Sequence, residues 1–122
     1  MQNKNKNFHE QLKKKMDDYA FFVYGATKVF PKEEIYGITS QIRRSSLSVI
    51  LNYIEGFART GDKQLKNFLN ISYGSLKESK YLLYFSNREG YLSDEKYQEL
   101  LKLAEEIGAM LWTTIKGLKD KS

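Results

Sequence analysis

The sequence has no cysteine, a single histidine and a single proline. The absence of cysteine excludes a disulfide framework, thiolate catalysis and cysteine-ligated zinc. The lone histidine, His9, belongs to no Glu-x-x-His element, the motif that builds di-metal sites in helical bundles. We therefore expect no metal site and no cofactor, and we expect His9 to be a solvated surface residue.

Long apolar runs are also missing. No stretch approaches the roughly 18 apolar residues of a membrane span. The lysine-containing N-terminal segment is not followed by the hydrophobic core of a signal peptide. We therefore expect a soluble, cytoplasmic protein without a membrane partner. A length of 122 residues suits one domain with one hydrophobic core.

No catalytic constellation can be assembled from the sequence. Glu105 and Glu106 are adjacent, so on a helix they point about 100° apart and cannot face one substrate. Glu55 lies four residues before Arg59, which would neutralise it, and no histidine is placed to activate a serine. We expect a non-enzymatic protein, and an enzyme such as a nuclease ranks last among the candidate functions.

Apolar residues recur at spacings of three and four along the chain, which is typical of amphipathic helices. Residues 1–6 are polar and repetitive and are expected to form a disordered tail, whereas residues 7–120 are expected to form the helices. Breaks between helices are predicted at Pro31, Gly61 and Gly90. The short loops favour a single-domain, all-α, up-down-up-down four-helix bundle.

Local signals mark the ends of these helices. Residues 32–34, which include two acids, are expected to open the second helix at the positive end of its dipole. Gly61 is expected to close that helix in the left-handed conformation, with Asp62 as the N-cap of the third helix. Ser93 is expected to be the N-cap of the fourth.

Small residues predict which two helices lie closest together. The third helix interleaves serines with leucines, and the second carries small residues on one side, so the two can approach each other closely. The small residues are Ser45, Ser46 and Gly56 in the second helix and Ser72, Ser75 and Ser79 in the third. The fourth helix keeps a seven-residue, coiled-coil pattern from Tyr97 to Leu118.

The segment from Gln41 to Arg59, QIRRSSLSVILNYIEGFAR, is apolar over more of its circumference than one bundle core needs. One side packs inside the bundle, and the second must meet either a neighbouring helix or another copy of the protein. Arg43 is expected to point into this second side. We predict that it is an oligomer interface formed by Leu47, Ile50, Leu51, Ile54 and Phe57.

The third helix ends in three aromatic residues, Tyr81, Tyr84 and Phe85, followed by Arg88. Aromatic rings interleaved with basic residues can stack on nucleic-acid bases. Rings with a wet hydroxyl are also typical of subunit interfaces. We favour the subunit interface and keep base stacking as the alternative.

The chain carries a net charge of +5 with a sequence pI near 9.3. The basic excess is concentrated before Pro31, where six lysines face three acids. Such an excess fits a nucleic-acid partner, and it is also how many domains stay soluble.

Three segments carry a family resemblance: Gln41–Arg59, FLNISYGSLKESKYLL from Phe68 to Leu83, and EEIGAMLWTTIKGL from Glu105 to Leu118. From about Phe21 onward the chain resembles the four-helix bundle family encoded within intervening sequences of bacterial 23S ribosomal RNA genes. That family is similar to the accessory variability determinant (Avd) proteins of diversity-generating retroelements. The family usually has Asn-Ile-Ala-Glu-Gly where this chain has Asn-Tyr-Ile-Glu-Gly at residues 52–56.

The resemblance implies a ring-shaped homopentamer with a basic surface that binds RNA or DNA. On this chain, the residues expected to make that surface are Arg43, Arg44, Arg59, Lys13, Lys14 and Lys15. Because Avd proteins partner a reverse transcriptase, the resemblance also supports a protein-interaction adaptor that docks an acidic protein and has no nucleic-acid role. Binding of labelled RNA at low salt distinguishes the two functions.

Overall fold

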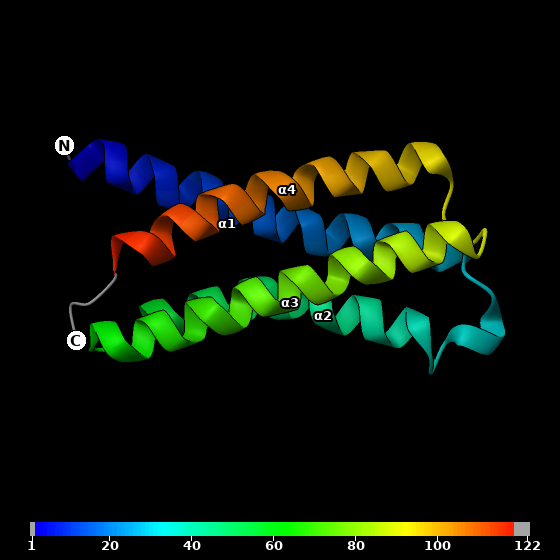
Figure 1. Ribbon diagram of the computed structural model, residues 1–122, viewed down its shortest axis with the longest axis horizontal. Helices are drawn as coiled ribbons and strands as arrows, with labels where there is room; N and C mark the ends of the chain where they lie inside the picture. The colour runs from blue at the N-terminus through cyan, green and yellow to red at the C-terminus, as the bar shows by residue number, and fades with distance from the viewer. Residues whose placement is uncertain (1, 119–122) are drawn as a thin grey trace.

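Four antiparallel helices account for most of the computed structural model, which describes residues 2–118. They are α1 (Gln2–Ala26), α2 (Ile38–Phe57), α3 (Asp62–Arg88) and α4 (Asp94–Gly117). Two short 3-10 turns, η1 (Thr27–Val29) and η2 (Lys32–Glu34), connect α1 to α2. Successive helices run in opposite directions (Figure 1). The predicted all-α, up-down-up-down bundle is confirmed.

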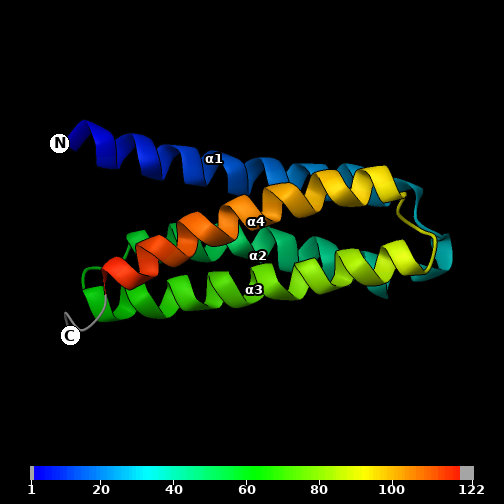
Figure 2. The same ribbon diagram turned by 45° about the horizontal axis from the view of Figure 1, so that its top comes forward.

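The helices form a four-sided arrangement in which each packs against two others. α1 contacts α2 and α4, while α3 contacts α2 and α4. The α1–α2 and α3–α4 connections lie at one end of the bundle, and the α2–α3 connection lies at the other end with the start of α1 and the end of α4 (Figures 1 and 2). Each helix therefore buries the side that faces the centre and leaves its outer side uncovered.

The first helix starts earlier than the sequence predicted. α1 begins at Gln2, so residues 2–6 are helical where a disordered tail was expected, because no proline or glycine interrupts the chain there. Met1 and residues 119–120, which the predicted tail and bundle included, lie outside the described residues. At the other end, η1 follows α1 and Pro31 separates it from η2.

The second helix starts later than the sequence predicted. Residues 32–34 form only the single turn η2, and α2 begins at Ile38 after the N-cap Gly37. Glu34 nevertheless serves the start of α2, because its Oε1 accepts a hydrogen bond from the Ile38 N–H at 3.4 Å. Its Oε2 accepts one from the Tyr91 hydroxyl at 3.0 Å, which ties the two loops at this end of the bundle together.

Of the other predicted helix ends, two are confirmed and one is wrong. Gly90 has a φ of 81°, the left-handed conformation that glycine adopts without strain. Ser93 caps α4 by accepting a hydrogen bond from the Lys96 N–H at 3.1 Å. Gly61, however, is extended, with φ −119° and ψ 148°, and is itself the N-cap of α3, so Asp62 is the first helical residue.

The core is one continuous stripe of buried side chains along the bundle axis. α4 contributes Leu100, Ala104, Ile107, Leu111 and Ile115, which confirms its seven-residue pattern. The stripe of α3 alternates leucine with serine: Leu69, Ser72, Leu76, Ser79, Leu83 and Ser86. The alternation makes this side of α3 unusually thin, and α2 packs against it more extensively than any other helix pair packs.

Serine hydroxyls form hydrogen bonds across the contact between α2 and α3, hereafter the α2–α3 seam. Ser72 Oγ donates to the Val49 carbonyl at 2.6 Å, and the hydroxyls of Ser48 and Ser75 lie 2.8 Å apart. At the end of the seam, a Cβ on Gly56 would lie 3.1 Å from both Leu65 Cδ1 and Phe68 Cβ. The prediction that the second and third helices form the closest pair is confirmed.

A buried tyrosine joins this seam to α1. Ser79 Oγ donates to the Leu76 carbonyl at 2.8 Å, so the Tyr19 hydroxyl, 2.8 Å from the same Oγ, is the donor of their shared hydrogen bond. Burial raises the pKa of Tyr19 above its ordinary value. The core therefore contains polar groups, and the hydrogen bonds of Tyr19, Ser72 and Ser79 stay inside the bundle.

A leucine at Gly56 tests the close approach of α2 and α3. We expect Gly56→Leu to lower the free energy of unfolding by about 1–3 kcal/mol, the usual cost of overpacking a filled contact. Gly74→Leu is the matched control, because nothing lies within 4 Å of a Cβ there. It should raise stability by roughly 0.5–1 kcal/mol through helix propensity. Urea unfolding measures both, and equal effects of the two substitutions would contradict the close approach.

Candidate assembly and nucleic-acid surfaces

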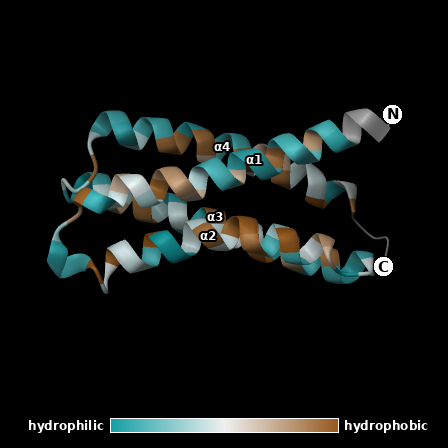
Figure 3. Cartoon of the chain, turned by 180° about the vertical axis from the view of Figure 1, so that it is seen from behind, coloured by the Kyte–Doolittle hydropathy of each residue, from teal (hydrophilic) through white to brown (hydrophobic). Residues whose placement is uncertain are grey.

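The outer side of α2 carries a row of large apolar residues at successive turns. Leu47, Leu51, Ile54 and Phe57, hereafter the α2 apolar stripe, are 44–53% exposed after the chain has folded. The middle and C-terminal part of α2 is largely hydrophobic when the bundle is viewed from behind (Figure 3). Single exposed apolar residues are ordinary, whereas large contiguous apolar patches are typical of interaction surfaces.

One member of the predicted interface lies elsewhere. Ile50 is only 8% exposed and belongs to the core of the single chain. The reason is helical geometry: Ile50 follows Ser46 by four residues and precedes Tyr53 by three, and both neighbours are buried. The second apolar side of this helix is therefore real but narrower than the sequence indicated.

Arg43 does not point into the α2 apolar stripe, so this prediction was wrong. Its Nε donates to Thr27 Oγ1 at 2.7 Å, and its guanidinium carbon lies 4.0 Å from the centroid of the Tyr24 ring. The side chain reaches across to the end of α1 because position 43 faces that helix. A hydroxyl and an aromatic face of the same chain are therefore the partners of this guanidinium group.

The other two candidate arginines differ in their surroundings. Arg59 forms the predicted ion pair with Glu55, and its guanidinium carbon lies 5.1 Å from the centroid of the Phe68 ring. Arg44 is exposed and makes no ion pair within residues 2–118. Of the candidate arginines, Arg44 is the one most available to a phosphate.

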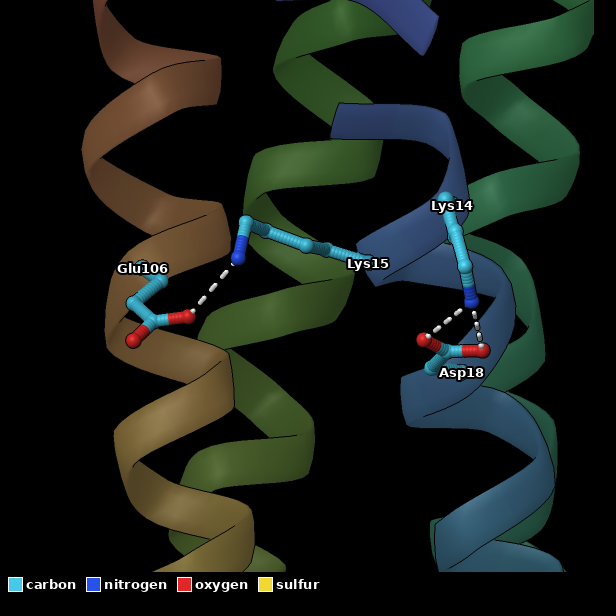
Figure 4. Close-up of polar contacts among 4 residues, drawn as sticks. All are labelled: Lys14, Lys15, Asp18 and Glu106. Atoms are coloured by element: carbon cyan, nitrogen blue, oxygen red, sulfur yellow. Dashed lines mark hydrogen bonds and ion pairs between the residues drawn. The ribbon is translucent and has the colours of Figure 1, made fainter. Parts of the chain in front are cut away.

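Two of the three candidate lysines are engaged inside the chain (Figure 4). Lys14 Nζ lies 2.9 Å from Asp18 Oδ2 on the same helix, and Lys15 Nζ lies 3.0 Å from Glu106 Oε1, which links α1 to α4. Lys13 is exposed and has no ion pair in the part of the chain that the structure describes. These exposed pairs are weak, so a phosphate could replace the carboxylates.

A single chain does not bring the six candidate cations into one site. Arg43 lies over Tyr24, eleven residues along α1 from Lys13, which corresponds to roughly 16 Å along the helix axis. The basic residues are therefore spread along the bundle. A continuous basic surface would need several copies of the chain.

His9 is not the solvated residue that the sequence predicted. Its Nδ1 lies 2.8 Å from the Tyr53 hydroxyl, and its ring meets Phe57 edge-on with centroids 5.3 Å apart. Tyr53 is a core residue, and its burial raises its pKa to about 12. A groove of about 520 Å³ runs beside this cluster between α1 and α2, with Lys13 and Ile54 in its lining.

The sequence did not predict two other grooves that the structure contains. One of about 650 Å³ lies between α1 and α4, beside the exposed rings of Phe21 and Phe22, and its rim holds two lysines and two glutamates. The second, of about 230 Å³, lies between α3 and α4 beside Tyr73 and Trp112. The sequence signal for the latter is an aromatic residue followed four positions later by lysine, at Tyr73–Lys77 and again at Trp112–Lys116.

In the part of the chain that the structure describes, chemistry could come from a metal site or from a titratable group with a raised pKa. No group of three or more histidine and acidic side chains lies close enough there to hold a metal ion. The Tyr91 hydroxyl has a raised pKa because it donates a hydrogen bond to Glu34, a structural contact between loops. No helix of the described chain combines the length and apolar character needed to cross a bilayer.

These features define a class: a single-domain antiparallel four-helix bundle whose notable surfaces are apolar and basic. Within that class, residues 9–113 match the family model of the 23S rRNA-intervening sequence protein, and the chain belongs to this family. The resemblance seen in the sequence is thus confirmed at family level. The likeness to Avd proteins stays a prediction.

A solved structure supports the same assignment. A crystal structure of a protein with unknown function from the S23 ribosomal protein family of Bacteroides thetaiotaomicron is similar to this chain, with a TM-score of 0.83. The two are 25% identical, and the similarity covers 89% of this chain and 98% of the other. Among curated proteins, no match was found.

Removing the Tyr53 hydroxyl tests the His9 contact and its dependence on pH. At neutral pH, Tyr53→Phe should lower the free energy of unfolding by about 1 kcal/mol, the usual net worth of one hydrogen bond. The folded-state pKa of about 12 exceeds the unfolded value near 10, so the unfolded chain loses this proton first as pH rises. Wild-type stability should therefore fall between pH 10 and 12.

The variant should show a shallower decline over that range, measured by urea unfolding at several pH values. Tyr81→Phe is the control, because Tyr81 is an exposed tyrosine. If the two variants follow the same pH curve, the raised pKa does not belong to Tyr53.

Proposed function

We propose that this protein is a non-enzymatic homo-oligomer that assembles through the α2 apolar stripe and binds RNA on its pooled basic surface in the cytoplasm. The observation that carries the proposal is the stripe itself, four large apolar side chains about half exposed on one side of α2. Such a surface on a bundle with an otherwise closed core supports contact with further copies.

The energetics indicate that the stripe needs help from neighbouring surfaces. Covering the exposed half of one such side chain yields roughly 1 kcal/mol, so the stripe supplies about 4 kcal/mol per copy. Association costs an estimated 4–15 kcal/mol. The aromatic residues of α3, Tyr81, Tyr84 and Phe85, are 40–60% exposed and can supply the additional area. The family resemblance sets the expected number of copies at five.

Assembly would also explain how scattered cations act together. Five copies multiply the net charge of +5 fivefold, and the resulting field attracts an RNA backbone from a distance. Among the candidate cations, Lys13 and Arg44 are favoured for contacts with RNA phosphates, because neither makes an ion pair in the described chain. Binding of this kind is sensitive to salt and tolerant of sequence.

Placing a charge in the stripe tests assembly. Leu51→Asp and Ile54→Asp should each convert the oligomer to a monomer, because a carboxylate cannot be buried in an apolar contact without a partner. Static light scattering gives the mass, and circular dichroism should show the helix content largely kept. Val29→Asp is the control, since Val29 is exposed in η1, outside the stripe. A wild-type protein that stays monomeric at tens of micromolar would refute assembly.

Charge reversal tests the RNA surface. Fluorescence anisotropy with a labelled structured RNA, at two salt concentrations, should show Lys13→Glu/Arg44→Glu binding about tenfold more weakly than wild type. The control is Lys96→Glu/Lys102→Glu, which changes net charge equally but alters lysines at the α1–α4 groove. It should bind only about twofold more weakly. Equal loss in both would mean that overall charge, and not this surface, decides binding.

The adaptor function is the second candidate, and the α1–α4 groove is the observation that favours it. Phe21 is 71% exposed at this groove, and its rim carries Lys96, Lys102, Glu99 and Glu106. A rim of mixed charge suits an amphipathic segment of another protein better than a polyanion. If the wild-type protein shows no RNA binding even at low salt, the adaptor function is the one that remains.

A further inference from the structure

We propose that the groove between α3 and α4 binds an unpaired base of single-stranded RNA, with Trp112 as the stacking surface and with Lys77 and Lys116 contacting the flanking phosphates. This inference rests on the RNA-binding function proposed above and names the residues that contact the base and its flanking phosphates. None of these residues was among the basic positions expected from the sequence.

The groove has room for one flat ring. It measures about 230 Å³, below the roughly 300–1,000 Å³ of pockets that enclose a whole ligand. Its lining includes two small residues of α4, Gly108 and Ala109, and Leu76 of α3. A Cβ on Gly108 would already touch Leu76 Cδ2 at 3.4 Å. Because Gly108 and Ala109 are small, a slot remains beside the aromatic side chains of the groove.

Two aromatic rings line this slot, one from each helix. The centroids of Tyr73 and Trp112 lie 5.6 Å apart with a 38° angle between the ring planes. Tyr73 is half-buried and supports Trp112, whose side chain remains 48% exposed. About half of Trp112 therefore remains accessible to a stacking base, and stacking of this kind tolerates any base.

The charges around the slot favour phosphate. Lys77 Nζ lies 5.6 Å from the centroid of Tyr73, and Lys116 Nζ lies 5.9 Å from that of Trp112. Neither lysine makes an ion pair among the residues that the structure describes. Lys80 contacts Glu105, the one acid in the groove lining, at 3.8 Å. The lining therefore holds two lysines against one glutamate. Lys116 lies outside the lining but beside Trp112, and it adds a third positive charge next to the aromatic rings.

The position of the groove is compatible with assembly. α3 and α4 lie toward the viewer in Figure 1. α2, which carries the α2 apolar stripe, lies toward the viewer in Figure 3, where the bundle is seen from behind. Contacts through the α2 apolar stripe would therefore leave the α3–α4 groove open. Tyr81, Tyr84 and Phe85, which are proposed to extend those contacts, are not among the residues that line the groove. Repeated grooves of this kind suit a single strand that passes from one subunit to the next.

Trp112 is the only tryptophan in the chain, so its fluorescence reports directly on the groove. We expect a short single-stranded RNA oligonucleotide, titrated at low salt, to quench this fluorescence as it binds. Trp112→Ala should weaken binding about tenfold by anisotropy, whereas Trp112→Phe should lose less because a ring remains. Tyr36→Ala is the control for losing an aromatic side chain, since Tyr36 is 94% exposed and outside the groove, and it should bind as wild type does.

Two further probes separate the base from the phosphates. An abasic oligonucleotide of equal length should bind more weakly and leave the tryptophan fluorescence unchanged. Lys77→Ala/Lys116→Ala should reduce the slope of log affinity against log salt by about 1.4, since each phosphate contact to a single strand contributes about 0.7. Circular dichroism checks that every variant keeps its helices.

The outcomes distinguish this inference from the function on which it rests. Binding by anisotropy with no quenching, or with Trp112→Ala unaffected, overturns the groove and leaves the RNA-binding function standing. Equal binding of the abasic oligonucleotide also overturns the groove. Absence of any RNA binding at low salt removes both proposals. Quenching by polyglutamate in that case would assign the groove to an acidic protein instead.

Discussion

The contact between α2 and α3 fixes the arrangement of this molecule. Serines alternate with leucines along the buried side of α3, so the two helices come close enough for Ser72 to donate a hydrogen bond to the Val49 carbonyl. A hydrogen bond to the backbone of a neighbouring helix sets the rotation of that helix about its own axis. With Val49 held against α3, Tyr53 points into the core and Leu51 points outward.

The exposed surfaces follow from this rotation. In a four-sided bundle each helix has an uncovered outer side, and on α2 that side is apolar. The buried hydroxyls of Tyr19 and Tyr53 have partners within the chain, so the core contributes specificity of packing. The proposed assembly rests on the exposed side chains of the α2 apolar stripe.

The basic side chains of this protein fall into two groups, those with a partner in the same chain and those without one among the described residues. Several cations are held by partners of the same chain: Arg43 by Thr27 and Tyr24, and Lys15 by Glu106. Others, such as Lys13 and Lys116, face solvent without a carboxylate in the described chain. The first group stabilises contacts between helices, and the second gives the surface its positive field. A count of basic residues in the sequence cannot separate these groups, because the partners of the first lie up to 91 residues away.

The sequence by itself determined the helices, their antiparallel order, the α2–α3 seam and the family, because spacings of three and four, loop glycines and small residues are local properties. The tertiary structure decided which side of each helix is covered. Ile50 is buried although it was assigned to the outer side, and His9 is held by Tyr53 and Phe57 from another helix. The α3–α4 groove beside Trp112 exists only where two distant segments meet. Contacts of this kind depend on the relative rotation of packed helices, which a one-dimensional pattern does not specify.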